Sequence, residues 1–200
     1  TVEVVNGKKP GPTLLVCGAI HGDEINGTEI IRQLLQSSSL KRLRGALIAV
    51  PVVNVLGFLN LSRYLPDRRD LNRSFPGSTK GSAASRVAHI FCRELLSQAD
   101  CGIDLHTAAV HRSNRPQIRA DLSNNDLAEL ARVFAAPVIV NAENRDGSLR
   151  GYAAELGKPL LVYEAGEALR FDEVSIRTGM RGVQRVMRHL GMLPGRAPAK

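Results

Sequence analysis

The stretch Thr13-Leu-Leu-Val-Cys-Gly-Ala-Ile20, followed directly by His21-Gly-Asp-Glu24, decides the fold. An apolar run of this length after a turn rich in proline and glycine predicts a buried strand over residues 13–20. Directly beyond it, residues 27–35 place apolar side chains at helical spacing. A buried strand that leads through a short polar turn into a helix is the repeating unit of an α/β fold.

The same alternation continues to the end of the chain. Further strands are predicted at residues 46–53, 101–105, 138–140 and 160–163, and further helices at 83–96, 126–134, 149–156 and 173–190. Strands that alternate with helices indicate an α/β fold with a mostly parallel mixed central sheet and helices on both faces. We expect one domain over residues 1–192 and a flexible tail or linker over 193–200, and nothing in residues 191–200 is predicted to pack.

Composition excludes several classes of protein. The chain has 200 residues, of which 44% are hydrophobic, and its longest apolar runs are strand-length, so neither a disordered chain nor a membrane span is predicted. Its three cysteines are widely spaced, which favours neither a disulfide framework nor a cysteine zinc site. A reducing compartment, the cytoplasm, is the expected location.

The net charge of +8 comes from 27 basic and 19 acidic residues. Such an excess can attract nucleic acid, an anionic membrane surface or a small acidic substrate. Because aromatic residues make up only 4% of the chain and tryptophan is absent, the stacking surfaces of single-strand binders are scarce. A nucleic-acid-binding domain is therefore an unfavoured alternative, motivated by the net charge and by four arginines on one face of the last predicted helix.

Residues 54–82 fit neither the strand nor the helix period, and they contain several glycines, prolines and charged residues. A loop of nearly thirty residues inside a compact domain is usually functional or disordered. We interpret this segment as functional.

Three of the five predicted strands end in a side chain that can ligate a metal or transfer a proton. His21 and Glu24 follow the first, His106 follows the third, and Glu164 follows the last. If these strands are parallel neighbours, the four side chains converge on one rim of the sheet, where α/β proteins bind ligands. Two histidines and one glutamate make a three-ligand zinc site with an open fourth position, and Asp104 is a candidate acceptor for an imidazole N–H.

Three motifs in this order resemble the succinylglutamate desuccinylase/aspartoacylase family. They are Gly18-Ala-Ile-His21-Gly-Asp-Glu24-Ile-Asn-Gly27, Asp70-Leu-Asn72-Arg73-Ser-Phe-Pro-Gly77 and Asp104-Leu-His106-Thr107. The resemblance covers about residues 13–190. It implies the fold of the zinc carboxypeptidase-like hydrolases and one zinc ion per chain.

The resemblance also implies a role for each matching residue. His21, Glu24 and His106 would bind zinc, and Glu164 would be the general base. Arg63 would polarise the scissile carbonyl or hold substrate, and Asn72 and Arg73 would hold the substrate carboxylate.

These roles agree with the chemistry of the residues themselves. Zinc lowers the pKa of bound water towards about 7, and a carboxylate such as Glu164 can take the proton and pass it to a leaving amine. The guanidinium of Arg73 can clamp a carboxylate bidentately, although a pair with Asp70 that stabilises the loop is the alternative. Arg63, Arg68 and Arg69 would surround the site as an electropositive funnel.

The sequence therefore predicts a zinc-dependent amidohydrolase, a deacylase that acts on carbon–nitrogen bonds other than peptide bonds. Its expected substrate is a small acidic N-acyl amino acid, and the chain is a possible homo-oligomer. A metallocarboxypeptidase or a cell-wall peptide amidase is the alternative within the metallohydrolases.

Two departures from the family pattern bear on substrate and activity. Relatives commonly carry a smaller β-rich domain after the catalytic one, which is absent here, so the isolated domain could bind zinc and be inactive. Relatives also often have proline where this chain has Val55, which affects how the loop after Asn54 begins.

Overall fold

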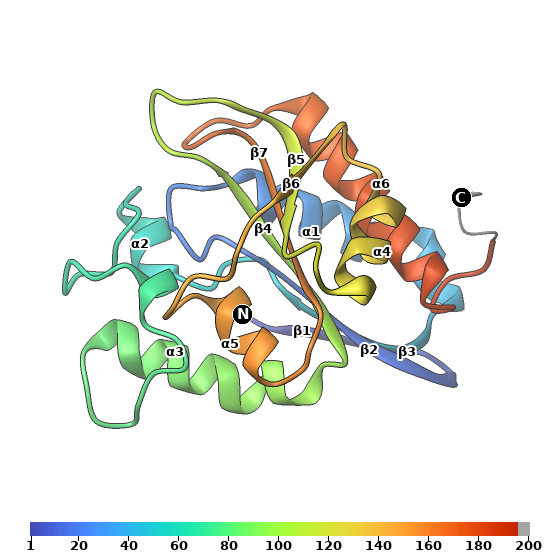
Figure 1. Cartoon of the computed structure of the whole chain (residues 1–200), viewed down its shortest axis with the longest axis horizontal. Coiled ribbons are helices and arrows are strands. Elements are labelled where there is room, and N and C mark those ends of the chain that lie inside the picture. The colour runs from blue at the N-terminus through green and yellow to red at the C-terminus, as the bar shows by residue number, and fades with distance from the viewer. Residues whose placement is uncertain (196–200) are drawn as a thin grey trace.

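The computed structural model describes residues 1–195 and shows seven strands in one sheet with helices on both faces (Figure 1). The strands are β1 (Glu3–Asn6), β2 (Lys9–Gly18), β3 (Arg44–Val50), β4 (Cys101–Ala108), β5 (Asn114–Ala120), β6 (Val138–Asn141) and β7 (Leu160–Glu167). The α-helices are α1 (Asn26–Gln36), α2 (Val55–Leu59), α3 (Ala83–Glu94), α4 (Asn125–Phe134), α5 (Leu149–Glu155) and α6 (Glu173–His189). Single 3-10 turns lie at η1 (Ser38–Arg42), η2 (Leu71–Arg73) and η3 (Leu96–Gln98).

The order of strands in the sheet is β1-β3-β2-β4-β7-β5-β6. The central strands β3, β2, β4 and β7 run parallel to one another, whereas β1 pairs antiparallel with β3 and β5 pairs antiparallel with β7. The predicted mostly parallel mixed sheet is therefore confirmed, and the two strands that the sequence analysis did not predict, β1 and β5, supply its antiparallel pairs.

Two hydrophobic clusters fill the two sides of the sheet, and β2 contributes to both. Leu14 and Val16 pack in the cluster that contains residues of α1, α4 and α6, while Leu15 and Cys17 pack in the cluster that contains residues of α3 and α5. Figure 1 shows the same division, with α1, α4 and α6 on one side of the sheet and α3 and α5 on the other. Because successive strand side chains point to opposite faces, the uninterrupted apolar run of β2 follows from burial on both.

Polar side chains cap the starts of α4 and α5. Ser148 accepts a hydrogen bond from the backbone N–H of Gly151 at the start of α5, and Asn124 accepts one from Leu127 at the start of α4. Such caps satisfy backbone donors that the first helical turn leaves free.

The segment 54–82 contains α2 and η2, so it is more ordered than the single irregular loop that the sequence predicts.

The end of the chain corrects another prediction. Met192 and Leu193 are buried in the cluster beside α6, and the backbone N–H of Arg44 donates to the carbonyl of Met192 at 2.9 Å. Gly191 has a φ of +72°, which turns the chain back onto the core after α6. The expectation that nothing packs after residue 190 is therefore wrong for these two residues, while residues 196–200 of the predicted tail lie outside the described part.

Within residues 1–195, no helix combines the length and the apolar character that crossing a bilayer would require.

Candidate metal centre and active site

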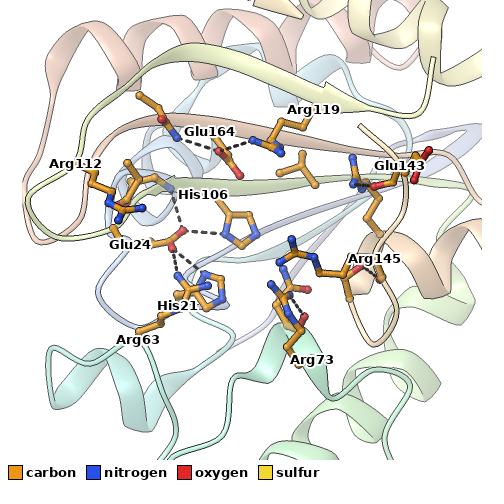
Figure 2. Close-up of a pocket in the computed structure, with 18 residues that line it drawn as sticks. His21, Glu24, Arg63, Arg73, His106, Arg112, Arg119, Glu143, Arg145 and Glu164 are labelled. Carbon is orange, nitrogen blue, oxygen red and sulfur yellow. Dashed lines mark hydrogen bonds and ion pairs between the residues drawn. The ribbon is translucent and has the colours of Figure 1, made fainter. Parts of the chain in front are cut away.

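Four side chains from three neighbouring strands meet at one edge of the sheet, as the sequence predicts. His21 and Glu24 lie in the turn after β2, and His106 and Glu164 lie near the carboxyl ends of β4 and β7 (Figure 2). Both β4 and β7 extend beyond their predicted ends, so His106 and Glu164 are strand residues that occupy paired positions in the parallel register. The strand pairing thus fixes the general-base candidate next to a candidate ligand.

The turn that carries His21 and Glu24 requires a glycine at position 22. A Cβ atom at Gly22 would lie 2.1 Å from the carbonyl carbon of Gly57, which is in α2. The backbone of the turn therefore lies directly against α2, and any larger residue would force one of the two segments to move.

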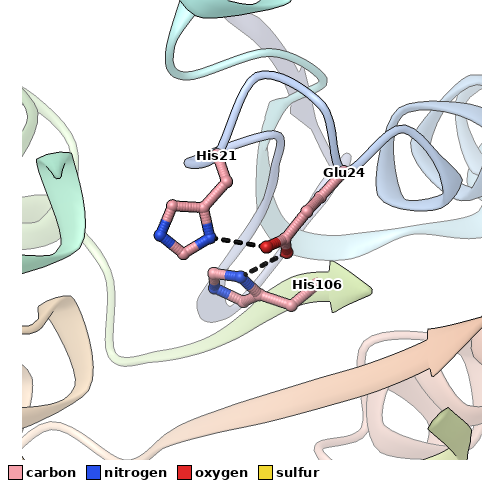
Figure 3. Close-up of side chains that lie close together, drawn as sticks. All are labelled: His21, Glu24 and His106. Carbon is pink, nitrogen blue, oxygen red and sulfur yellow. Dashed lines mark hydrogen bonds and ion pairs between the residues drawn. The ribbon is translucent and has the colours of Figure 1, made fainter. Parts of the chain in front are cut away.

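His21, Glu24 and His106 form a buried group, which we call the ligand cluster (Figure 3). One ligand atom from each residue lies within 4.8 Å of the others. The Nδ1 atom of His21 lies 2.7 Å from Oε1 of Glu24, and Nδ1 of His106 lies 2.8 Å from Oε2. Both imidazoles therefore turn the same nitrogen towards one carboxylate.

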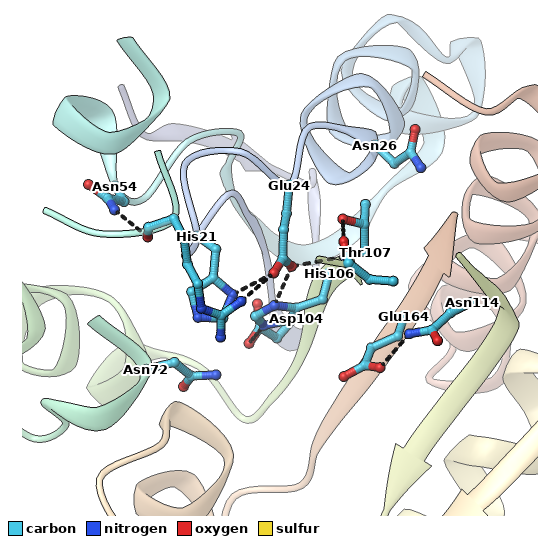
Figure 4. Close-up of polar contacts among 12 residues, drawn as sticks. His21, Glu24, Asn26, Asn54, Asn72, Asp104, His106, Thr107, Asn114 and Glu164 are labelled. Atoms are coloured by element: carbon cyan, nitrogen blue, oxygen red, sulfur yellow. Dashed lines mark hydrogen bonds and ion pairs between the residues drawn. The ribbon is translucent and has the colours of Figure 1, made fainter. Parts of the chain in front are cut away.

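The other nitrogen of each imidazole contacts a further carboxylate. Nε2 of His106 lies 2.6 Å from Asp104, and Nε2 of His21 lies 3.0 Å from Asp70 (Figure 4 labels the first pair). Carboxylates in this position orient histidine ligands in metalloproteins and raise their basicity. The contact of Asp104 with His106 agrees with the sequence prediction, whereas the contact of Asp70 with His21 is an addition to the pair with Arg73 that the sequence suggests.

The charges of the cluster are strongly coupled. Burial works against the carboxylate of Glu24, but the charges of His106 and His21 hold its pKa well below the usual range. Burial also disfavours the charged form of His106, but Asp104 and Glu24 outweigh it and raise its pKa. The ligand cluster is thus a site in which fixed negative charge surrounds two imidazoles.

This arrangement fits a divalent metal ion. Among residues 1–195, Nδ1 of His21 is buried and forms no hydrogen bond, although Oε1 of Glu24 lies 2.7 Å from it. An electron pair on such a nitrogen, a second imidazole nitrogen and a carboxylate oxygen are the donor set of a catalytic zinc site. Three carboxylates around the two imidazoles would compensate the charge of the ion.

Glu164 is held by β5, a strand that the sequence analysis did not predict. Its Oε2 atom accepts hydrogen bonds from the side chains of Asn114 at 2.9 Å and Gln117 at 3.3 Å, and Arg119 lies 3.8 Å away. Along β5, Gln117 and Arg119 are half-buried on the pocket side, whereas Ile118 is fully buried in the core. Because most of its side chains are polar, β5 lacks the apolar alternation by which a strand can be predicted from sequence.

The three predicted substrate residues lie around the same pocket, with contacts that the sequence does not reveal. Arg63 donates to Glu24 at 3.0 Å and to Asp70 at 3.2 Å. The Oδ1 atom of Asn72 accepts from the backbone N–H of Leu149 at 2.9 Å, which ties η2 to the start of α5. Arg73 donates to the backbone carbonyl of Asn72. Within residues 1–195 it has no ion pair with Asp70, whose carboxylate instead contacts Arg63 and His21.

These residues surround a cavity of about 380 Å³. Six arginines and three glutamates line it: Arg63, Arg73, Arg112, Arg119, Arg145, Arg150, Glu24, Glu143 and Glu164. The predicted funnel is therefore wrong in part, because Arg68 and Arg69 do not line the cavity and four arginines from later segments do. Burial lowers the pKa of Arg73, and the positive charges of Arg145 and Arg63 add to this effect.

Comparisons with known proteins agree with this architecture. A sequence model described as the succinylglutamate desuccinylase/aspartoacylase catalytic domain matches residues 10–190. The N-alpha-acetyl-L-2,4-diaminobutyric acid deacetylase of Halomonas elongata is 30% identical over 193 residues, which cover 92% of this chain and 56% of that protein.

Solved structures are similar over the whole chain. A succinylglutamate desuccinylase from a Silicibacter species superposes with a TM-score of 0.90 at 28% identity, covering 100% of this chain and 63% of its own. The product-bound ectoine utilization protein EutE (DoeB) from Ruegeria pomeroyi has a TM-score of 0.91 at 30% identity, with the same coverage. The predicted fold is confirmed by these similarities, and the chain spans less than two thirds of the length of these relatives.

Proposed function

Because this chain belongs to the succinylglutamate desuccinylase/aspartoacylase family, we propose that it is a zinc-dependent hydrolase that cleaves the amide bond of a small acidic N-acyl amino acid. The observation that carries the proposal is the ligand cluster, with its three ligand atoms within 4.8 Å of one another, beside Glu164 in one cavity. The arginines of that cavity favour an anionic substrate. The N-acetyl amino acid in the name of the Halomonas elongata relative is one candidate substrate.

His21, Glu24 and His106 would hold the metal ion, while Asp70 and Asp104 keep the two imidazoles in orientation. A bound zinc ion would polarise the scissile carbonyl and make water more acidic. Glu164 would accept a proton from the attacking water on its carboxylate and deliver it to the nitrogen of the leaving amine. The hydrogen bonds from Asn114 and Gln117 keep that carboxylate in place.

The remaining predicted residues would bind the substrate. Arg63 reaches the edge of the ligand cluster, where its guanidinium can donate to the oxygen of the scissile carbonyl. Asn72 and Arg73 would hold a substrate carboxylate, and the guanidinium of Arg73 can do so with two parallel hydrogen bonds.

We also propose that the protein is located in the cytoplasm, because its three cysteines are unpaired and buried.

The first test is the metal content per chain, measured by elemental analysis after exhaustive dialysis. We expect about one zinc ion in the wild type and a loss of the ion in His106→Ala, which removes a ligand. His189→Ala is the matched control, because His189 lies on α6 beside Glu129, away from the cavity. A folded wild-type protein that takes up no zinc would overturn the proposed metal chemistry.

The second test separates catalysis from metal binding. Glu164→Gln should keep the metal but lower kcat by about 10²–10⁴-fold, because it removes the proton acceptor and no ligand. The measurement is the release of free amine from N-acyl amino acids, together with metal content. Near-normal turnover in this variant would show that Glu164 is not the general base.

A further inference from the structure

Six basic side chains line a second cavity, of about 530 Å³, which we call the basic pocket. They come from the start of β2, from η1, from the start of β3 and from the last turn of α6. They are Lys8, Lys9, Lys41, Arg42, Arg44 and Arg188. Because β2 and β3 are parallel and start here, the basic pocket lies at the edge of the sheet opposite the ligand cluster. Figure 1 shows the end of α6 on the right of the molecule and α2 on the left.

The segment after α6 gives the basic pocket its concave shape. Met192 and Leu193 are buried, and the carbonyl of Met192 accepts a hydrogen bond from the backbone N–H of Arg44 at 2.9 Å. Gly195 lies against the side chain of Arg188, since a Cβ atom at Gly195 would be 3.4 Å from Cδ of that arginine. The same segment lines the pocket, so the returning chain forms one of its sides.

The positive charge of the basic pocket is not compensated by the protein around it. No acidic side chain lines the pocket, and within residues 1–195 none of the six cations lies within 4.0 Å of a carboxylate oxygen. Lys9 and Arg44 occupy paired positions in the parallel register, so two like charges begin neighbouring strands. Like charges held close together repel one another, and an anion between them would remove that repulsion.

The end of α6 does not account for this cluster. Cations often compensate the partial negative charge of a helix C-terminus, but only Arg188 belongs to the last turn of α6. The carbonyls there already accept backbone hydrogen bonds, from Gly191 to Arg188 at 3.0 Å and from Met192 to Met187 at 2.8 Å. The other five cations come from β2, η1, β3 and the turn before β2, so their convergence needs another explanation.

The side chains of the basic pocket favour a ligand recognised by its charge. Its volume is in the range of sites for small ligands. Among the described residues that line it, every polar side chain is a lysine or an arginine, and none is aromatic. A nucleobase would therefore find no stacking surface. A phosphate monoester carries a charge of about −1.5 to −2 near neutral pH, and both arginine and lysine bind phosphate, so a short chain of phosphates matches the pocket best.

We propose that the basic pocket is a binding site for a small oligophosphate, either free inorganic triphosphate or the triphosphate group of a nucleotide. The basic pocket shares no lining residue with the cavity beside the ligand cluster. The proposal therefore goes beyond amide hydrolysis and does not depend on it.

Calorimetry of the full chain with inorganic tripolyphosphate tests the site. We expect one ion bound in the basic pocket per chain, with an affinity that falls as salt is added. The variant Arg44→Gln/Arg188→Gln should weaken this binding about tenfold or more, because it removes two charge-assisted contacts. Lys9→Gln/Lys41→Gln changes only exposed side chains, so it gives the same test if the first variant does not fold. Absence of wild-type binding at about 1 mM tripolyphosphate would overturn the proposal.

Three control variants locate the bound ion. Arg86→Gln/Arg132→Gln removes the same charge from exposed positions on α3 and α4 and should change the affinity by less than about twofold. Arg73→Gln/Arg119→Gln removes it from the cavity beside the ligand cluster, and His106→Ala removes a candidate metal ligand. Both should still bind one tripolyphosphate. If these two lose the binding and the basic-pocket variants keep it, the ion binds at the other cavity and the proposal is wrong.

Other anions test the class of ligand. Affinity for ATP equal to that for tripolyphosphate would assign recognition to the phosphate chain alone, whereas about tenfold tighter binding of ATP would identify a nucleotide as the source. Citrate, a polycarboxylate, should bind about tenfold more weakly than tripolyphosphate, and equal affinity would refute an oligophosphate site. Duplex DNA that binds more tightly than tripolyphosphate, with an affinity that rises with its length, would show an extended nucleic-acid surface and would also overturn the proposal.

Discussion

The ligand cluster lies on one side of the cavity, and three arginines, Arg119, Arg145 and Arg150, which we call the arginine wall, lie on another. The two groups differ in how completely their charges are paired. In the ligand cluster, Glu24 receives contacts from two imidazoles and from Arg63, so buried charges of both signs are matched. In the arginine wall, the guanidiniums of Arg145 and Arg150 have no carboxylate within 4.0 Å in the described chain. Matched charges fix a geometry, whereas unmatched charges are available to a ligand.

The largest change in stability that would test this contrast is expected when the carboxylate of Glu24 is removed. In chelator-treated protein, Glu24→Ala should lower the free energy of unfolding by about 3–5 kcal/mol, because it leaves the buried imidazole of His106 and the backbone N–H of Thr107 without their acceptor and removes the carboxylate that pairs with His21. Urea unfolding of wild type and variant measures the difference. A loss below about 1 kcal/mol would mean that the cluster does not depend on the carboxylate that we place at its centre.

A smaller effect, on metal affinity, is expected when either carboxylate that contacts Nε2 of a histidine, Asp104 or Asp70, is changed. Asp104→Asn should weaken metal affinity about 10–100-fold, because the neutral amide no longer orients and polarises His106 through Nε2. Competition with a chelator of known affinity measures this change. Asp70→Asn should act similarly through His21, and Asp146→Asn, at an exposed position, is the control. Equal affinities in all four proteins would contradict the positioning role.

The smallest effect, and one of opposite sign, is expected in the arginine wall. Arg150→Met should raise the free energy of unfolding by up to about 1 kcal/mol, because it removes a buried donor without a partner at the cost of one hydrogen bond to Glu143. Urea unfolding without added anions measures it. A decrease in the free energy of unfolding by more than about 1 kcal/mol would show that Arg150 stabilises the fold and is not an unsatisfied group available to a ligand.

The contrast also explains which parts of the site could be predicted from the sequence. His21, His106 and Glu164 could be predicted because each stands at or near the end of an apolar run, and the ends of parallel strands meet at one edge. Asp104 could be predicted from its position two residues before His106 on the same strand. The central strands and the helices that cover them follow from apolar periodicity in the same way.

The arginine wall could not be predicted by that reasoning. Arg119 lies in a strand with an irregular pattern, and Arg145 lies in a loop, so neither stands next to a recognisable signal. The contact between Asp70 and His21 spans 49 residues and depends on how the segment 54–82 folds back over the cavity. Pairing between such distant segments is a property of the tertiary structure.

The alternation of side chains along β5 has a consequence for how this protein can change. Gln117 donates to Glu164 and Arg119 lines the cavity, while Ile118 and Ala120 are fully buried in the core. Mutations at the first two positions can therefore alter the cavity without disturbing packing, because neighbouring residues of a strand point to opposite faces. A library randomised at residue 119, with Gln117 kept to hold Glu164, would sample new selectivities on an unchanged scaffold, and natural variation at this position can do the same.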